Sequence, residues 1–207
     1  MGRAALKMQM TAAEFVAWEE LQTIKHEFVN GEVFEMGRPG ETQAMAGAGE
    51  AHVTLTGNAY VALRQHLKGT PCRCFFVDMR LRVEAADAYF YPDLMVTCSQ
   101  ADARTALVKA EPLLLVEVLS PSTAAYDRGD KFAAYRRLPS LREYLLIDPE
   151  SRRCDLYRVG ADGLWVLHPF EAGEDLHLAS VGLALPATVL WEDVPAVGPG
   201  PSSMASA

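Results

Sequence analysis

The chain has 207 residues, half of them hydrophobic and 22% charged, so it is long enough to bury a substantial core and too apolar to be disordered as a whole. Its formal net charge of −8 disfavours binding to nucleic acid through a general basic surface, although a local basic stripe or a metal ion can still meet a phosphate. The sequence lacks both a signal-peptide core and the roughly 18 apolar residues of a membrane helix, so we expect a cytoplasmic protein that does not enter the membrane.

The chain is predicted to begin with a loose end over residues 1–10, followed by a helix. Thr11 and Glu14 have the spacing of a capping box, in which each residue satisfies a backbone amide of the other. Apolar residues recur at helical spacing after this pair, which predicts a helix over 12–21.

A hairpin and a second helix follow. Asn30-Gly31 is the strongest short hairpin signal, and the alternation of polar and apolar residues around it predicts two strands within 26–36. Residues 37–50 are rich in glycine and small side chains and are expected to form a loop. The apolar pattern over 51–67 predicts a helix.

The middle of the chain is predicted to form three strands, over 74–83, 88–97 and 113–119. The last of these is a continuous apolar run around one acid, which is typical of a strand covered on both faces near the centre of a sheet. Pro92 has no amide to donate, so we expect the second strand to be distorted there.

The C-terminal half is predicted to hold a helix over 127–138, with Asp127 as its N-cap. Further strands are predicted over 143–148, 153–159 and 164–169, with a terminal strand and turn over 180–190. Residues 195–207 are rich in Pro, Gly, Ser and Ala and are expected to be a disordered tail. The mixture of helices and strands predicts one α/β domain of the mixed α+β kind, covering 11–193.

Four cysteines, Cys72, Cys74, Cys98 and Cys154, are too few for a disulfide framework in a chain of this length. Only one residue separates Cys72 from Cys74, which is closer than the first pair of ligands in most zinc sites. We therefore expect all four to be reduced thiols.

Two lone acids lie in apolar strands. Glu117 is the only charged residue between Leu113 and Leu119, and Asp93 follows Pro92 in the preceding strand. Burial of an unpaired carboxylate costs several kcal/mol, so each acid needs a metal, a cation, a proton or an opening to solvent. Adjacent strands lie about 4.8 Å apart, which allows two carboxylates to share one hard cation.

Each candidate also has a structural interpretation. Glu117 can belong to an ion pair, for which Arg128 is one candidate partner, or it can lie at a strand end that is open to solvent. Asp93 can serve turn formation after its proline. Asp148 precedes Pro149, a pair that commonly starts a turn, and we interpret it as structural.

Several blocks, in this order, make the chain resemble the Uma-two family of restriction endonucleases, a branch of the PD-(D/E)xK nuclease superfamily. The blocks are Thr11–Trp18, His26–Met36, the segment around His52, Tyr91–Val96, Leu115–Thr123, Asp127–Tyr135 and Glu143–Pro149. The Glu-Val-Leu-Ser-Pro-Ser-Thr and Asp-Arg-Gly-Asp-Lys sequences are the most specific of them.

The resemblance implies a restriction-endonuclease-like mixed sheet flanked by helices, with additional hairpins, in a protein that forms a homodimer. It implies that Asp93 and Glu117 are metal ligands and that Glu27 is an accessory acid near the site. The superfamily usually carries a lysine two residues after the glutamate, where this chain has Leu119. Lys131, on the helix that follows, is the expected substitute.

The leading hypothesis is hydrolysis of DNA phosphodiester bonds with Mg²⁺ or Mn²⁺ held by Asp93, Glu117 and the Val118 carbonyl. Lys131 would position or activate the attacking water. Three alternatives remain at this stage: a catalytically silent nuclease fold that binds a partner or nucleic acid, a metal-dependent hydrolase of another phosphate ester, and a structural module. Leu119 and the acidic net charge favour the silent fold.

Overall fold

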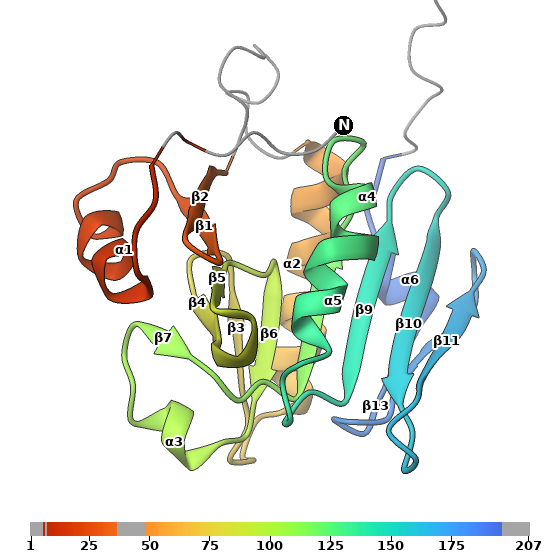
Figure 1. Ribbon diagram of the computed structural model, residues 1–207. Helices are drawn as coiled ribbons and strands as arrows, with labels where there is room; N and C mark the ends of the chain where they lie inside the picture. The colour runs from red at the N-terminus through yellow and green to blue at the C-terminus, as the bar shows by residue number, and fades with distance from the viewer. Residues whose placement is uncertain (1–5, 7, 37–48, 196–207) are drawn as a thin grey trace, which may run out of the picture.

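The computed structural model describes residues 6, 8–36 and 49–195, which form a mixed α+β fold (Figure 1). The predicted fold class is therefore confirmed. The helices and strands of the N-terminal half are α1 (Ala12–Glu19), β1 (His26–Val29), β2 (Glu32–Glu35), α2 (Glu50–His66), β3 (Arg73–Phe76), β4 (Arg80–Val83), the 3₁₀ turn η2 (Glu84–Ala86), β5 (Ala88–Phe90), β6 (Leu94–Thr97) and α3 (Gln100–Ala103).

The C-terminal half holds a long helical segment and the remaining strands. Its elements are β7 (Val108–Lys109), β8 (Leu114–Val118), α4 (Ala124–Tyr126), the π-helical turn η3 (Asp127–Lys131), α5 (Phe132–Tyr135), β9 (Glu143–Asp148), β10 (Arg153–Val159), β11 (Trp165–Phe170), β12 (Leu176–Leu178), β13 (Leu183–Leu185) and α6 (Ala187–Leu190). Among the described residues, no helix is both long and apolar enough to span a bilayer.

A six-stranded sheet, in the order β11-β10-β9-β8-β6-β3, forms the centre of the fold. Its strands are antiparallel except for β8 and β9, which are parallel. In the view of Figure 1, α2 and α6 lie behind this sheet, and the helical segment that ends in α5 lies in front of it. A five-stranded sheet, β2-β1-β5-β4-β7, stands beside it, and β12 pairs with β13.

Strand β8 is covered on both faces, as its apolar run predicts. Leu114, Val116 and Val118 join the core cluster that contains α2, whereas Leu115 and Leu119 join the cluster that contains α5. Since side chains alternate along a strand, Glu117 shares the α5 side. The lone acid of β8 is thus directed between α5 and the five-stranded sheet.

Two of the predicted strands are each divided between the two sheets. The predicted strand 74–83 breaks at Val77, whose φ is 55°, so that β3 belongs to the six-stranded sheet and β4 to the five-stranded one. The predicted strand 88–97 breaks at Pro92 in the same way, into β5 and β6. The Val77 amide donates to the Asp93 carbonyl at 3.1 Å, so the two breaks lie side by side.

The helical segment formed by α4, η3 and α5 begins at Ala124, three residues before the predicted start at 127. Ser120 initiates it, because its carbonyl accepts the amides of Thr123 (3.1 Å) and Ala124 (2.9 Å). The prediction that Asp127 is an N-cap is wrong, since Asp127 lies inside the segment, in its π-helical turn. The N-terminal hairpin, α2 and β9 occur where the sequence predicts them.

Other expectations need correction. The expected loose end at 1–10 is ordered in part, because the amide of Met10 donates to the Gly31 carbonyl at 3.1 Å and Gln9 bridges to Glu32. Helix α3 and strands β7 and β12 were not predicted, and the segment 180–190 contains β13 and α6. The predicted loop at 37–50 and the tail at 195–207 lie largely outside the described residues.

The expectation of four reduced cysteines is wrong for one pair. Cys72 and Cys98 form a disulfide, and they occupy the position just beyond the antiparallel pair Arg73–Thr97 of β3 and β6. The pairing depends on strand register, which cysteine spacing in the sequence does not reveal. Cys74 and Cys154 are free and buried.

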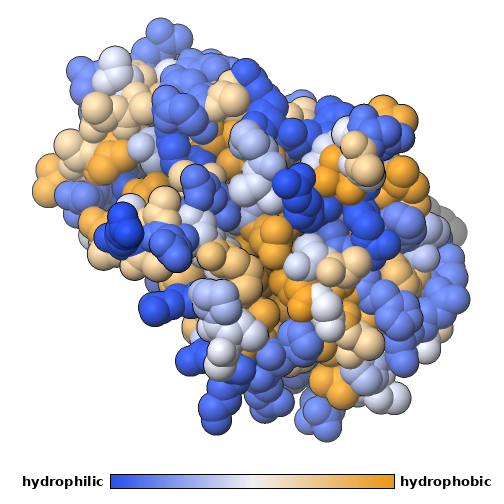
Figure 2. All heavy atoms as spheres, turned by 90° about the horizontal axis from the view of Figure 1, so that it is seen from below, coloured by the Kyte–Doolittle hydropathy of each residue, from blue (hydrophilic) through white to orange (hydrophobic). Residues whose placement is uncertain are grey.

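The surface outside the core mixes polar and apolar residues. Viewed from below, hydrophobic residues form several separate groups, in the middle, on the left and at the upper right, among hydrophilic ones (Figure 2). The most exposed large apolar side chains, such as Leu21, Leu107 and Leu164, lie in turns and loops that are far apart in the sequence. Scattered exposure of this kind is ordinary for a folded domain.

The disulfide predicts a measurable thiol count and a stability effect. Titration of thiols in denaturant without reductant should find two reactive cysteines, and reduction should lower the free energy of unfolding by about 3 kcal/mol, since the bond closes a loop with a sequence separation of 26. Urea unfolding with and without reductant measures the difference, and the Cys72→Ser variant serves as the permanently reduced control. Four reactive thiols would contradict the pairing.

Glu143 is expected to be essential to the C-terminal packing. It is fully buried in β9 and accepts bonds from Arg158 Nε (2.7 Å) and from the amides of Ala179 and Ser180. Glu143→Ala should therefore lower the free energy of unfolding by about 3 kcal/mol in urea titrations, because it leaves two amides without their acceptor and removes one of the two partners of Arg158. Glu150→Ala, at an exposed glutamate, should change it by less than about 0.5 kcal/mol. Similar losses in both variants would contradict this account.

Candidate active site

Asp93 and Glu117 lie opposite each other on neighbouring strands. The ladder between β6 and β8 ends at the pair Leu94–Val116, and the next position places Asp93 across from Glu117. Asp93 Oδ2 accepts the Val118 amide at 2.7 Å, which holds the aspartate against β8. A quarter of the Asp93 side chain is exposed, while that of Glu117 is 5% exposed. The pair therefore has one acid at the surface and one in the interior.

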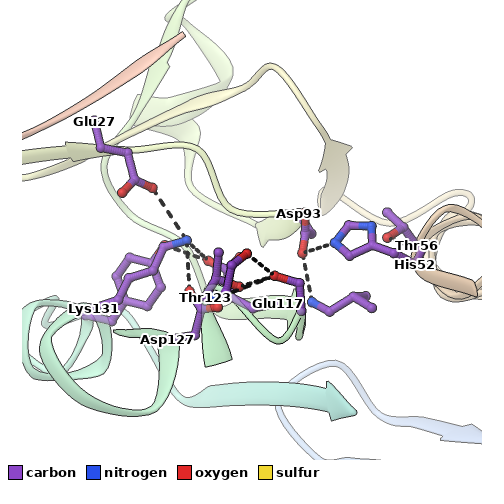
Figure 3. A network of polar contacts seen from close by, with 12 residues as sticks. Glu27, His52, Thr56, Asp93, Glu117, Thr123, Asp127 and Lys131 are labelled. Atoms are coloured by element: carbon purple, nitrogen blue, oxygen red, sulfur yellow. Dashed lines mark hydrogen bonds and ion pairs between the residues drawn. The ribbon is translucent and has the colours of Figure 1, made fainter. Parts of the chain in front are cut away.

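Lys131 stands among three carboxylates that come from different parts of the fold (Figure 3). Its Nζ is 2.8 Å from Glu117 Oε1, 3.4 Å from Asp127 Oδ1 and 3.5 Å from Glu27 Oε1. All four side chains are at most 6% exposed. Lys131 thus reaches Glu117 of β8 from the π-helical turn, and its role as the substitute lysine stays a prediction.

Burial and neighbouring charges shift the pKa values of Glu117 and Lys131. Desolvation raises the pKa of Glu117 well above its usual value, and the carboxylates of Asp93 and Asp127 raise it further against the effect of Lys131. Desolvation lowers the pKa of Lys131, but Glu117, together with Tyr135, Glu27 and Asp127, raises it well above its ordinary value. Lys131 is therefore an ammonium, and the surrounding carboxylates have an affinity for a further cation or a proton.

Two buried tyrosines hold this arrangement in place. Tyr135 Oη donates to Glu117 Oε1 at 2.9 Å, and Tyr144 Oη donates to the Asp127 carbonyl at 3.1 Å. Burial raises the pKa of both phenols well above the usual value, so they remain donors. Glu117 is consequently turned towards α5.

His52 is a site residue to which the sequence argument gave no role. Its Nε2 is 3.3 Å from Asp93 Oδ2. Desolvation lowers the pKa of His52, but hydrogen bonds to Asp93 and to the Val118 carbonyl raise it above its ordinary value. The available signal was periodicity: His52 lies on the buried stripe of α2 with Leu55 and Ala59, where a polar residue needs a partner.

The rival cation Arg128 is directed elsewhere. It lies 3.4 Å from Asp148 and 3.6 Å from Asp155, so the prediction that it could pair with Glu117 is wrong. Asp148 shapes the turn after β9, as predicted, since its Oδ1 accepts the amides of Glu150 (3.0 Å) and Ser151 (3.3 Å).

The donor atoms suit a hard divalent cation. The Asp93 and Glu117 carboxylates and the Val118 carbonyl offer oxygen ligands of the kind that Mg²⁺ and Mn²⁺ prefer. Within the described residues, no group of three or more His, Cys, Asp or Glu side chains converges on a position that could hold an ion. One reason is that Glu117 is engaged by Lys131 and Tyr135. By charge and donor type, the two carboxylates and the backbone carbonyl match what such a cation prefers.

Comparisons with known proteins agree with the fold. Two relatives from Synechocystis are described as uncharacterized proteins: slr1290 is 34% identical over 88% of this chain and 92% of its own length, and sll1609 is 36% identical over 76% and 85%. A solved structure from Anabaena variabilis, described as a "putative nuclease belonging to DUF820", matches with a TM-score of 0.69 and 18% identity, over 88% of this chain and 97% of that one.

A family model supplies the identification. The model described as "Uma2: Putative restriction endonuclease" matches residues 12–188, which include both strands that carry the acids and the helical segment that carries Lys131. The matched span is most of the chain, and the family that the sequence blocks resemble is the one that the model identifies. The protein belongs to the Uma2 family.

Proposed function

We propose that the protein is a metal-dependent endonuclease that hydrolyses phosphodiester bonds in DNA. The observation that carries the proposal is the contact of the Lys131 ammonium with Glu117, directly across from Asp93 at the strand end. Two acids and a lysine at one point of a mixed sheet supply what phosphodiester hydrolysis requires, namely a cation site and a fixed positive charge. The family description and the fold of the Anabaena protein support the same reaction class.

Asp93, Glu117 and the Val118 carbonyl would hold Mg²⁺ or Mn²⁺. The cation would acidify a water molecule and stabilise negative charge on the phosphate. The net charge of the site supports this role. Glu117, Glu27 and Asp127 all lie around the single ammonium of Lys131, so carboxylates outnumber cations there. Such a divalent cation would offset the desolvation, and the repulsion from Asp93 and Asp127, that raise the pKa of Glu117.

Lys131 has a positioning role in this proposal. The three carboxylates around its Nζ favour the ammonium form, so we assign it no role as a base. The contacts of the ammonium with Asp127 (3.4 Å) and Glu27 (3.5 Å) are longer than its contact with Glu117 (2.8 Å), so an N–H would turn from one of these two acids to orient the attacking water or a phosphate oxygen. Of the two roles that the sequence left open for this lysine, positioning is therefore the one we propose.

A catalytically silent fold is the second candidate, and a specific observation favours it. Glu117 and Lys131 satisfy each other in a buried pair, with Tyr135 as a further partner, which is what a purely structural ion pair requires. The silent fold and the nuclease differ in metal binding and in cleavage. DNA as the substrate, assembly as a homodimer and a cytoplasmic location stay predictions.

Nicking of supercoiled plasmid tests the proposed reaction. The wild-type protein should convert plasmid to nicked or linear forms with Mg²⁺ or Mn²⁺ and not with EDTA. Asp93→Asn and Glu117→Gln should each lower the rate by about 10²–10³-fold, because each removes charge at the cation site. Agarose gels with timed samples measure the rates.

Asp130→Asn and Glu150→Gln are the matched controls, since both residues are exposed and Asp130 directly precedes Lys131. Both should cleave at the wild-type rate. Cleavage that persists in Asp93→Asn and Glu117→Gln would reject the proposed site. Saturable metal binding without cleavage of any DNA or phosphate-ester substrate would favour the silent fold.

Lys131→Met separates the lysine's function from its contribution to folding. We expect a loss of cleavage of about 100-fold, because the fixed positive charge disappears, together with a lower free energy of unfolding. Lys109→Met is the control, since Lys109 is equally buried and donates to the Asp102 carbonyl at 2.7 Å, outside the site. Plasmid cleavage at a temperature where both variants are folded, by circular dichroism, makes the comparison. Equal cleavage by the two variants would contradict the role of Lys131.

A further inference from the structure

His52 contacts one of the oxygens that the proposed function assigns to the cation and lies beside the residue that supplies another. Its Nε2 is 3.3 Å from Asp93 Oδ2, the same oxygen that accepts the Val118 amide at 2.7 Å. Figure 3 shows the imidazole of His52 directed at Asp93, on the side of the site away from Lys131. The His52 nitrogen and the Asp93 carboxylate therefore lie together, next to the backbone of Val118.

We propose that His52 is a nitrogen ligand of the divalent cation, a proposal that rests on the metal-dependent function above. Two ligand atoms that are each about 2.1 Å from a shared ion, at roughly 90–105° to each other, lie about 3.0–3.3 Å apart. The separation of 3.3 Å between Nε2 and Oδ2 matches this range. The ring can thus exchange its hydrogen bonds for a metal bond with little movement.

The helix that carries His52 is suited to holding a ligand. Residues Leu55 and Ala59, one and two turns further along α2, are buried against the six-stranded sheet and fix its position. The His52 side chain is 23% exposed, so its ring is held by its surroundings and still has access to solvent. Ligands on packed helices and strands keep their geometry better than ligands on loops.

A cation at His52 and Asp93 does not require Glu117 to move. Glu117 faces Lys131 and Tyr135 in this structure, whereas Asp93, His52 and the Val118 carbonyl are on the other side. The ligation by His52 therefore adds a donor that the two-acid arrangement lacks. An imidazole among oxygen ligands also changes metal preference, since imidazole suits transition metals and Mg²⁺ favours oxygen alone.

Mn²⁺ alone is the probe for this ligand, and the readout is independent of cleavage. Mn²⁺ titration of the full chain, followed by electron paramagnetic resonance, gives the affinity, and pulsed measurements detect coupling to ¹⁴N. We expect ¹⁴N coupling in the wild type and its loss in His52→Gln, with Mn²⁺ affinity reduced at least about tenfold and Mg²⁺ affinity, measured by competition, reduced less.

His66→Gln is the control, because His66 lies at the end of the same helix, is exposed and contacts the Val181 carbonyl at 2.9 Å. It should retain both the coupling and the affinity. Wild-type protein labelled with ¹⁵N-histidine should show ¹⁵N in place of ¹⁴N coupling, which tests for a histidine ligand even where His52→Gln does not fold.

The outcomes separate this proposal from the proposed function. Mn²⁺ binding that depends on Asp93 and Glu117 but shows no histidine coupling, and that is unchanged in His52→Gln, would overturn the role of His52 and leave the cation site standing. An absence of saturable Mn²⁺ binding by the wild type would overturn both. Coupling that disappears with His52 and persists with His66→Gln would establish the ligand.

Discussion

The contact between the Lys131 ammonium and the Glu117 carboxylate is the interaction on which the rest of the site depends. Both groups are buried, and a buried charge is tolerated only when its partners are close and well oriented. The fold meets this condition by bringing Glu27 from β1, Asp127 from η3 and the Tyr135 hydroxyl from α5 to the same point. The two sheets and the helical segment are therefore linked by charge as well as by apolar packing.

The passage of the chain between the two sheets explains the other half of the site. The strands on either side of Pro92 belong to different sheets, and Asp93 lies at the start of the second one. A continuous strand would have placed the backbone of Pro92 opposite that of Val118 in the ladder, by the register of Leu94 with Val116. The break instead leaves the Asp93 carboxylate free to reach the Val118 amide and His52. The proline that interrupts hydrogen bonding in the sheet is thus what makes an aspartate available at its edge.

Short-range sequence patterns predicted the elements whose formation depends on neighbouring residues. The Asn30-Gly31 turn, the stripe of α2 and the apolar runs of β8 and β9 each carry their own signal, and each forms where it was expected. Asp93, Glu117 and Lys131 stood out because acids in apolar strands are costly and because family blocks contain them. That Lys131 would reach Glu117 was expected because a helix that follows a strand packs back on the sheet in this fold class.

The features that sequence did not reveal depend on contacts between distant segments. The Cys72–Cys98 disulfide follows from strand register, and the breaks at Val77 and Pro92 follow from the competition of two sheets for the same strands. His52 is one histidine on an apolar stripe, and only the position of Asp93 shows its partner. Interactions of this kind become visible once the strands are placed in order.

The π-helical turn between Asp127 and Lys131 has a further consequence. Such a turn accommodates one more residue than an α-helical turn, so it offsets the rotation of the helix that follows. Before the turn, Ser120 sets the start of the segment; after it, Phe132 and Tyr135 are fixed by the core. The extra residue lets Lys131 face the carboxylates, while α4 before the turn and α5 after it each keep the orientation that their own contacts require. In a segment shortened by one residue, the core contacts of Phe132 and Tyr135 and the contacts of Lys131 with its carboxylates could not both be kept.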